Sequence, residues 1–247
     1  MNINGEPMPL PSKISPCPID DAAIELRFDA AIPYDAIFGL VYNSLKDKYP
    51  EVEKLPILQV PEDIRIKDPN LIYKPYYAMK NDNLQCLIGP RTIAVSHVQN
   101  EYLGWDKFLP SVLEIFKIVE QLKIVKRVEK LGMRYVNFFN FNIYEKINLN
   151  IHMGDRRLAD YPTYFRTEMK SGKYTSALQV ANNATHTAKK MTGSIIDIDV
   201  TLEDFGEDFF ERKQSILNEA HLKEKELFFE LLKPEFIKTL NPEYASE

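Results

Sequence analysis

The feature that most constrains the fold is a period-two alternation of apolar and polar side chains within residues 194–202. Apolar residues occupy every second position from Ile196 to Leu202, and Asp197 and Asp199 lie between them. Successive side chains of a β-strand point to opposite faces, so the pattern predicts a strand with one apolar and one acidic face. Such a strand belongs in an antiparallel sheet that is covered on one side only.

Other segments alternate in the same way and are separated by short turns. Separators such as 81–83 and 89–91 favour antiparallel hairpins over parallel crossovers. Residues 51–70 contain three prolines and are predicted to form a long connection with one edge strand near Leu58. The remaining strands are predicted at 22–28, 71–80, 84–88, 92–98, 127–141, 148–153, 163–169, 174–180 and 194–202.

Three segments place apolar residues at helical spacing, and the sequence therefore predicts amphipathic helices at 34–49, 105–123 and 207–232. The predicted fold class is α+β, with antiparallel sheets packed against these three long helices. The order of elements indicates either two similar halves, 22–124 and 125–240, or one continuous curved sheet. Residues 1–21 are expected to form an extended proline-rich arm and residues 241–247 a tail.

Composition narrows the functional classes. A chain of 247 residues with 45% hydrophobic side chains can build a substantial core, and no apolar run is long enough to span a membrane. The formal net charge of −5 argues against a nucleic-acid partner. Cys17 and Cys86 follow no paired spacing, which suits a reducing compartment. We expect a cytoplasmic protein without a cofactor.

Four motifs occur in order along the chain: IELRF at 24–28, GWDKF at 104–108, LGMRYVN at 131–137 and SIIDIDV at 194–200. Together they resemble a sporadically distributed prokaryotic family of about this length that has no assigned biochemical function. The resemblance implies a shared fold and supplies no catalytic residue. The chain departs from the family pattern at 20–22, where Asp-Asp-Ala replaces an apolar-acidic-Ala step.

Three arginines, Arg27, Arg134 and Arg166, occupy polar positions of predicted strands. Strand pairing would gather them on one surface together with carboxylates. If that surface is concave, it forms a site for an anionic ligand, because a guanidinium binds carboxylate or phosphate through two parallel hydrogen bonds. If it is convex, it is a lattice of salt bridges.

A second candidate site consists of Asp197 and Asp199, with Glu168 as a third oxygen donor if their strands are close. Hard cations such as Mg²⁺ are held by one or two carboxylates with water and phosphate. The alternative is a solvated sheet face on which these acids pair with Arg or Lys across strands.

Two functional hypotheses follow. The first is a non-enzymatic binding or accessory protein that recognises a protein partner or a small anionic ligand. The alternative is a divalent-metal-dependent phosphoryl or nucleic-acid hydrolase that uses Asp197, Asp199 and Glu168. An apolar segment after the last helix, with Phe236 and Leu240, is expected to pack either on its own chain or in a homodimer.

Overall fold

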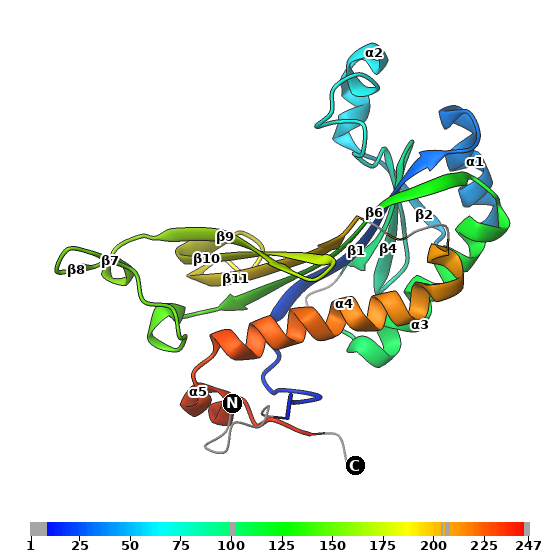
Figure 1. The fold of residues 1–247 in the computed structure, drawn as a ribbon. Helices are drawn as coiled ribbons and strands as arrows, with labels where there is room; N and C mark the ends of the chain where they lie inside the picture. Colours follow the sequence, from blue (N-terminus) through cyan, green and yellow to red (C-terminus); the bar gives the residue numbers. More distant parts are fainter. Residues whose placement is uncertain (1–8, 99–101, 204, 206–207, 245–247) are drawn as a thin grey trace.

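A computed structural model describes residues 9–98, 102–203, 205 and 208–244. In this part of the chain, nine strands form one antiparallel sheet in the order β2-β3-β4-β5-β1-β6-β11-β10-β9 (Figure 1). This antiparallel sheet and the helices packed against it confirm the predicted α+β class. The sheet strands are β1 (Ile19–Ala30), β2 (Glu51–Lys54), β3 (Tyr77–Lys80), β4 (Leu84–Gly89), β5 (Thr92–His97), β6 (Val125–Phe139), β9 (Tyr164–Ser171), β10 (Tyr174–His186) and β11 (Met191–Leu202). The α-helices are α1 (Tyr34–Leu45), α2 (Glu62–Arg65), α3 (Trp105–Gln121), α4 (Phe209–Leu231) and α5 (Pro234–Thr239).

The strand order repeats between the two parts of the sheet. In the first part β1 is flanked by β5, and β4 and β3 follow; in the second part β6 is flanked by β11, and β10 and β9 follow. Each part ends in a long helix: α3 follows β5, which pairs with β1, and α4 follows β11, which pairs with β6. The long strands β1 and β6 pair in the centre. The sheet is therefore continuous, and its two parts share a topology.

The three long helices cover one face of the sheet. In Figure 1, α3 and α4 run below the strands, and α4 contacts β11 and β6. In β1, the buried residues Ala22, Ile24, Leu26 and Phe28 alternate with partly exposed ones, as period-two patterning requires. The apolar side chains thus face the helices. No helix within the described residues has both the length and the apolar character needed to cross a membrane.

The connection between β2 and β3 differs from the prediction. Leu58 lies in a 3₁₀ helix, η1 (Pro56–Gln59), and the predicted edge strand at this position is therefore wrong. The edge strand is β2, which ends before Pro56, because proline has no N–H to donate to a sheet. The short helix α2 follows and projects on the opposite side of the sheet from α4 (Figure 1).

Other boundaries differ as well. The strand predicted at 71–80 is confined to β3, since residues 69–73 form turns, and the strand predicted at 148–153 is reduced to β7 (His152–Met153), which pairs only with β8 (Arg156–Arg157). The apolar tail forms α5, and Phe236 and Leu240 are buried against their own chain. The tail therefore leaves little apolar surface for a second copy.

Candidate functional site: the polar face of the sheet

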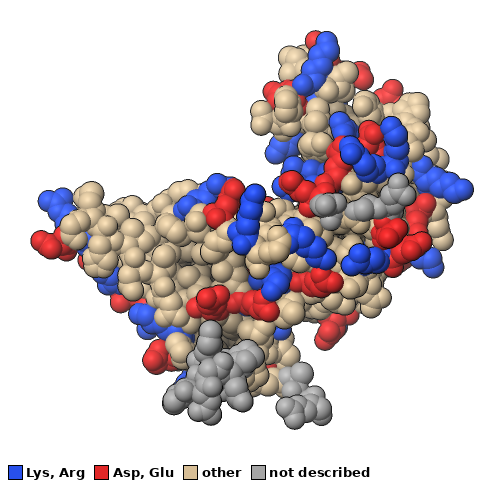
Figure 2. Space-filling model, in the orientation of Figure 1, with Lys and Arg blue, Asp and Glu red and all other residues tan. Residues whose placement is uncertain are grey.

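The face of the sheet opposite the long helices is polar, and the strand register places all the predicted site residues on it. Directly paired residues of neighbouring strands have side chains on the same face. Figure 2 shows Lys, Arg, Asp and Glu side chains gathered where the strands meet the part of the molecule that carries α2. We use the term polar face for the surface formed by Glu25, Arg27, Lys130, Gly132, Arg134, Arg166, Glu168, Gln179, Asp197 and Asp199, as their pairing defines it.

Arg134 and Asp197 form an ion pair with two parallel hydrogen bonds on the polar face. Arg134 Nε donates to Asp197 Oδ1 at 2.9 Å and Nη2 donates to Oδ2 at 2.7 Å, while Gln179 Nε2 donates to Oδ2 at 2.9 Å. The hydrogen bond to Asp197 raises the pKa of Arg134. Asp197 is only 8% exposed, whereas the Arg134 side chain is 52% exposed. The pair thus links β6 to β11 and still presents part of its guanidinium to solvent.

Gly132 lies next to Arg134 on this face, two residues earlier in β6. It pairs with Glu25 on one side and with Thr201 on the other, in regular register without a bulge. A Cβ added there would lie 3.7 Å from Asp199 Oδ1 and 4.0 Å from Glu25 Cβ, which is ordinary contact. Burial raises the pKa of Asp199. Gly132 is buried, and the polar face has no side chain at this position, beside a partly desolvated carboxylate.

Arg27 anchors the connection that leads to β3. Its Nε donates to Glu25 Oε2 at 2.8 Å, and Thr92 Oγ1 donates to Glu25 Oε1 at 3.2 Å. The Arg27 guanidinium also lies 5.1 Å from the centre of the Tyr73 ring, and the Tyr73 hydroxyl donates to Glu129. Cation–π contact and these hydrogen bonds hold the end of the connection on the polar face.

The three arginines share a face but are far apart. Arg166 pairs with Glu168 on β9, three strands away from Arg134, which corresponds to about 14 Å. Arg27 lies opposite Lys130, four residues along β6 from Arg134, which again corresponds to about 14 Å. One small anion needs its donors within about 3 Å of its oxygens. A single phosphate or carboxylate would not reach all three.

The predicted metal ligands Asp197, Asp199 and Glu168 do not converge on one point. Among the residues that the structure describes, no group of three or more His, Cys, Asp or Glu side chains is arranged to hold a metal ion. Asp197 is bound by Arg134 and Glu168 by Arg166. Ala177 of β10 stands between Asp199 and Glu168 in the sheet.

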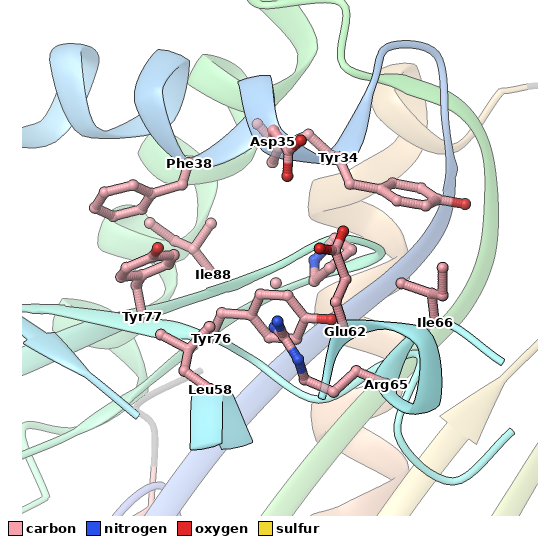
Figure 3. A pocket seen from close by; sticks show the side chains of 13 residues that line it. Tyr34, Asp35, Phe38, Leu58, Glu62, Arg65, Ile66, Tyr76, Tyr77 and Ile88 are labelled. Carbon is pink, nitrogen blue, oxygen red and sulfur yellow. The ribbon is translucent and has the colours of Figure 1, made fainter. Parts of the chain in front are cut away.

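A pocket of about 280 Å³ lies between α1 and α2 (Figure 3). Phe38 stacks on Tyr77 with ring centres 3.8 Å apart, and the Arg65 guanidinium lies 4.4 Å from the centre of the Tyr76 ring. Arg65 already occupies the face of Tyr76, and the volume is below the roughly 300 Å³ at which ligand pockets usually begin. The polar face is therefore the stronger candidate.

A buried polar cluster lies on the other side of the sheet, beneath β6. The hydroxyls of Tyr102 and Tyr135 are 3.0 Å apart, and Trp105 stacks on His221 of α4 at 4.1 Å. Burial raises the pKa of Glu224, one turn further along α4, to about 8 and lowers the pKa of His221 to about 3. Both groups are thus neutral in the folded protein near pH 7.

Sequence patterns single out neither Gly132 nor Glu224. The role of Gly132 depends on which residues pair with it, and register cannot be derived from one sequence. Glu224 stands in a run of four charges, 223–226, that resembles a solvated surface. It also lies four residues after Ala220 and four before Phe228, which are both buried, so helical periodicity contains the signal.

No protein-family model matches this chain, and the comparison with curated proteins gives no match. The resemblance to the prokaryotic family therefore stays a prediction.

Proposed function

We propose that this protein is a non-enzymatic binding module that recognises a protein partner through its polar face, centred on Gly132. The main support is the missing side chain at this position. The register around Gly132 is regular, its φ is outside the left-handed region, and an added Cβ would make only ordinary contacts with Asp199 and Glu25, although Gly132 itself is buried. Glycine within a strand costs roughly 0.5–1 kcal/mol relative to alanine. Close approach of another molecule is a recognised reason for such a glycine.

The charges around Gly132 indicate what the partner offers. Lys130 is engaged by Glu203 at 3.0 Å, and Arg134 by Asp197. Among the described residues no side-chain hydrogen bond reaches the Asp199 carboxylate, and burial raises its pKa while the nearby charges of Lys130 and Arg134 oppose this rise. A basic or hydrogen-bond-donating side chain of the partner would pair with this carboxylate. The spacing of the arginines favours an extended protein surface over a small anion.

Affinity capture with matched glycine variants tests this proposal. The tagged protein, Gly132→Thr and Gly39→Thr would be expressed in the natural host cell and purified. Gly39 is exposed on α1, and an added Cβ there has nothing within 4 Å. We expect the unchanged protein and Gly39→Thr to retain a stoichiometric partner, and Gly132→Thr to retain at least about tenfold less, the effect of about 1.4 kcal/mol. Equal retention by both variants at equal thermal stability would refute the proposal.

Thermal melting with Mg²⁺ or Mn²⁺ separates this proposal from the hydrolase alternative. A metal that binds the folded state raises the melting midpoint with its concentration. Under our proposal the midpoint does not depend on either ion. A rise that disappears in Asp197→Asn and Asp199→Asn would instead support the hydrolase.

We also assign the protein to the cytoplasm. Both cysteines are free thiols, Cys17 at the surface and Cys86 in the core. Exposed free thiols suit a reducing compartment. A fusion to a compartment-specific fluorescent reporter in the natural host tests this assignment, and export of the fusion would contradict it.

A further inference from the structure

The two ends of the sheet differ in how they are protected. β2 has four residues, and Pro50 and Pro56 stand close to its ends. β9 has eight residues without a proline, and only one neighbouring strand among the described residues. Tyr164 and Met169 on β9 are 63% and 38% exposed. Short strands and prolines protect sheet edges from pairing with another chain. β9 has neither of these two features, and its edge carries the charges of Arg166, Glu168 and Lys170 instead.

The hairpin after β9 determines which of its backbone groups are free. Gly172 and Lys173 form a two-residue loop, and Ser171 pairs with Tyr174 across it. Residues that flank such a loop exchange backbone hydrogen bonds, and hydrogen-bonded and non-hydrogen-bonded pairs then alternate along the strands. The even-numbered residues of β9, from Tyr164 to Lys170, therefore direct their N–H and C=O groups toward the free edge. The same residues carry the side chains of the polar face.

We propose that the β9 strands of two copies pair antiparallel about a two-fold axis at Thr167, so that the sheet continues across a homodimer. In this register Arg166 of each copy lies opposite Glu168 of the other. Tyr164 lies opposite Lys170, and on the helix side Phe165 lies opposite Met169. Each pair is complementary: two salt bridges, two cation–π contacts and two apolar contacts.

Neighbouring registers are not complementary. Pairing must keep even-numbered residues opposite even-numbered ones, because only these have free backbone groups. An axis at Arg166 places the two Arg166 side chains opposite each other. An axis at Glu168 opposes the two Glu168 side chains and sets Arg166 against Lys170. Like charges opposite each other destabilise a pair of strands. Of these three registers, only the axis at Thr167 makes the facing side chains complementary.

This proposal is independent of the partner site. Gly132 lies on β6, three strands away from β9. A dimer formed through β9 does not involve Gly132, and it joins the polar faces of the two copies side by side. The pairing is isologous, so it closes after two copies.

Charge exchange tests the register in the full chain. Sedimentation velocity over a concentration series would give the dimer dissociation constant of the unchanged protein, Arg166→Glu, Glu168→Arg and the double exchange. Each single change opposes like charges in both symmetric pairs, and we expect at least about tenfold weaker dimerisation. The double exchange restores opposite charges and is expected to restore dimerisation. A monomeric unchanged protein, or single variants that dimerise normally, would overturn the proposal.

A cross-linking experiment tests the position of the axis. In a Cys17→Ser background, Thr167→Cys places two thiols opposite each other in a non-hydrogen-bonded pair, where Cα atoms are about 4.5 Å apart. We expect mild oxidation to produce a covalent dimer. Ser171→Cys is the matched control, because Ser171 would face Thr163 of the other copy and is expected not to cross-link. Equal cross-linking of the two variants would overturn the assigned register.

Discussion

Glu224 allows the sharpest quantitative prediction. Its side chain is buried beneath β6, and burial raises its pKa from 4.5 to about 8. Below pH 4.5 the carboxyl is protonated in both the folded and the unfolded chain, so its burial adds no pH-dependent cost. Between pH 4.5 and 8 the unfolded chain ionises while the folded protein keeps the proton. The free energy of unfolding therefore falls as pH rises through this window, and the loss is complete above pH 8.

The size of the effect follows from the two pKa values. A rise from 4.5 to about 8, at about 1.4 kcal/mol per unit, corresponds to about 5 kcal/mol. Glu224→Gln has nearly the same shape and does not ionise. We predict that the substitution removes this loss, so that the variant is more stable than the unchanged protein by up to about 5 kcal/mol at pH 8.5, relative to their difference at pH 4.5.

Urea denaturation at several pH values between 4 and 9 provides the measurement. Glu226→Gln, at a partly exposed position on the same helix, is the matched control and is expected to keep the pH dependence of the unchanged protein. Parallel pH profiles for Glu224→Gln and the unchanged protein would refute the reasoning that Glu224 is neutral when folded.

Three further predictions concern other residues. Arg134→Gln leaves Asp197 buried without its charged partner and is expected to lower the free energy of unfolding by about 1–3 kcal/mol. Adding Asp197→Asn is expected to recover most of this loss, and urea denaturation of the unchanged protein, the two single variants and the double variant measures the coupling. Burial lowers the pKa of His221 to about 3, so the free energy of unfolding of the protein falls as pH falls from 6.5 toward 3. We therefore expect His221→Phe to flatten the acid side of the stability profile, which thermal melting at several pH values would measure. Gly193→Ala would place a Cβ 2.0 Å from the carbonyl oxygen of Phe139 and is expected to cost about 3 kcal/mol or more, whereas a normal melting midpoint would show that the strands can separate there.

The parts of the fold that depend on local periodicity could be predicted from the sequence. The alternation at 194–202 correctly assigns Ile196 and Ile198 to the buried face and Asp199 to the polar face. Helical spacing likewise locates the three long helices, because an amphipathic stripe is visible in one sequence. Short elements such as α2 and η1 could not be predicted, since tertiary contacts of a few residues stabilise them.

The candidate site could be predicted only in part. Asp197 belongs to the polar face, but its burial depends on Arg134 and Gln179 reaching it from two neighbouring strands. The spacing of about 14 Å between the arginines likewise follows from strand order. One sequence contains neither strand order nor register, so the prediction could name these residues without saying which of them meet.

The reason for a glycine at position 132 can be asked only once its neighbours in the sheet are known. If β6 needs glycine for its own bend, Gly132→Ala will lower stability. If the missing side chain instead serves the approach of a partner, the same substitution is expected to raise stability by about 0.5–1 kcal/mol while it weakens partner retention. Thermal melting of Gly132→Ala beside the capture experiment distinguishes the two.

The most direct test of the central claim is to map where a captured partner touches the protein. Amine cross-linking of the purified complex, followed by mass spectrometry, would identify the lysines nearest to the partner. We predict cross-links from Lys130 on the polar face and from Lys170 on β9, whose side chain lies on the same side of the sheet. Cross-links confined to Lys117 on α3 and Lys223 on α4 would contradict the claim, because the partner would then bind the helix side of the sheet.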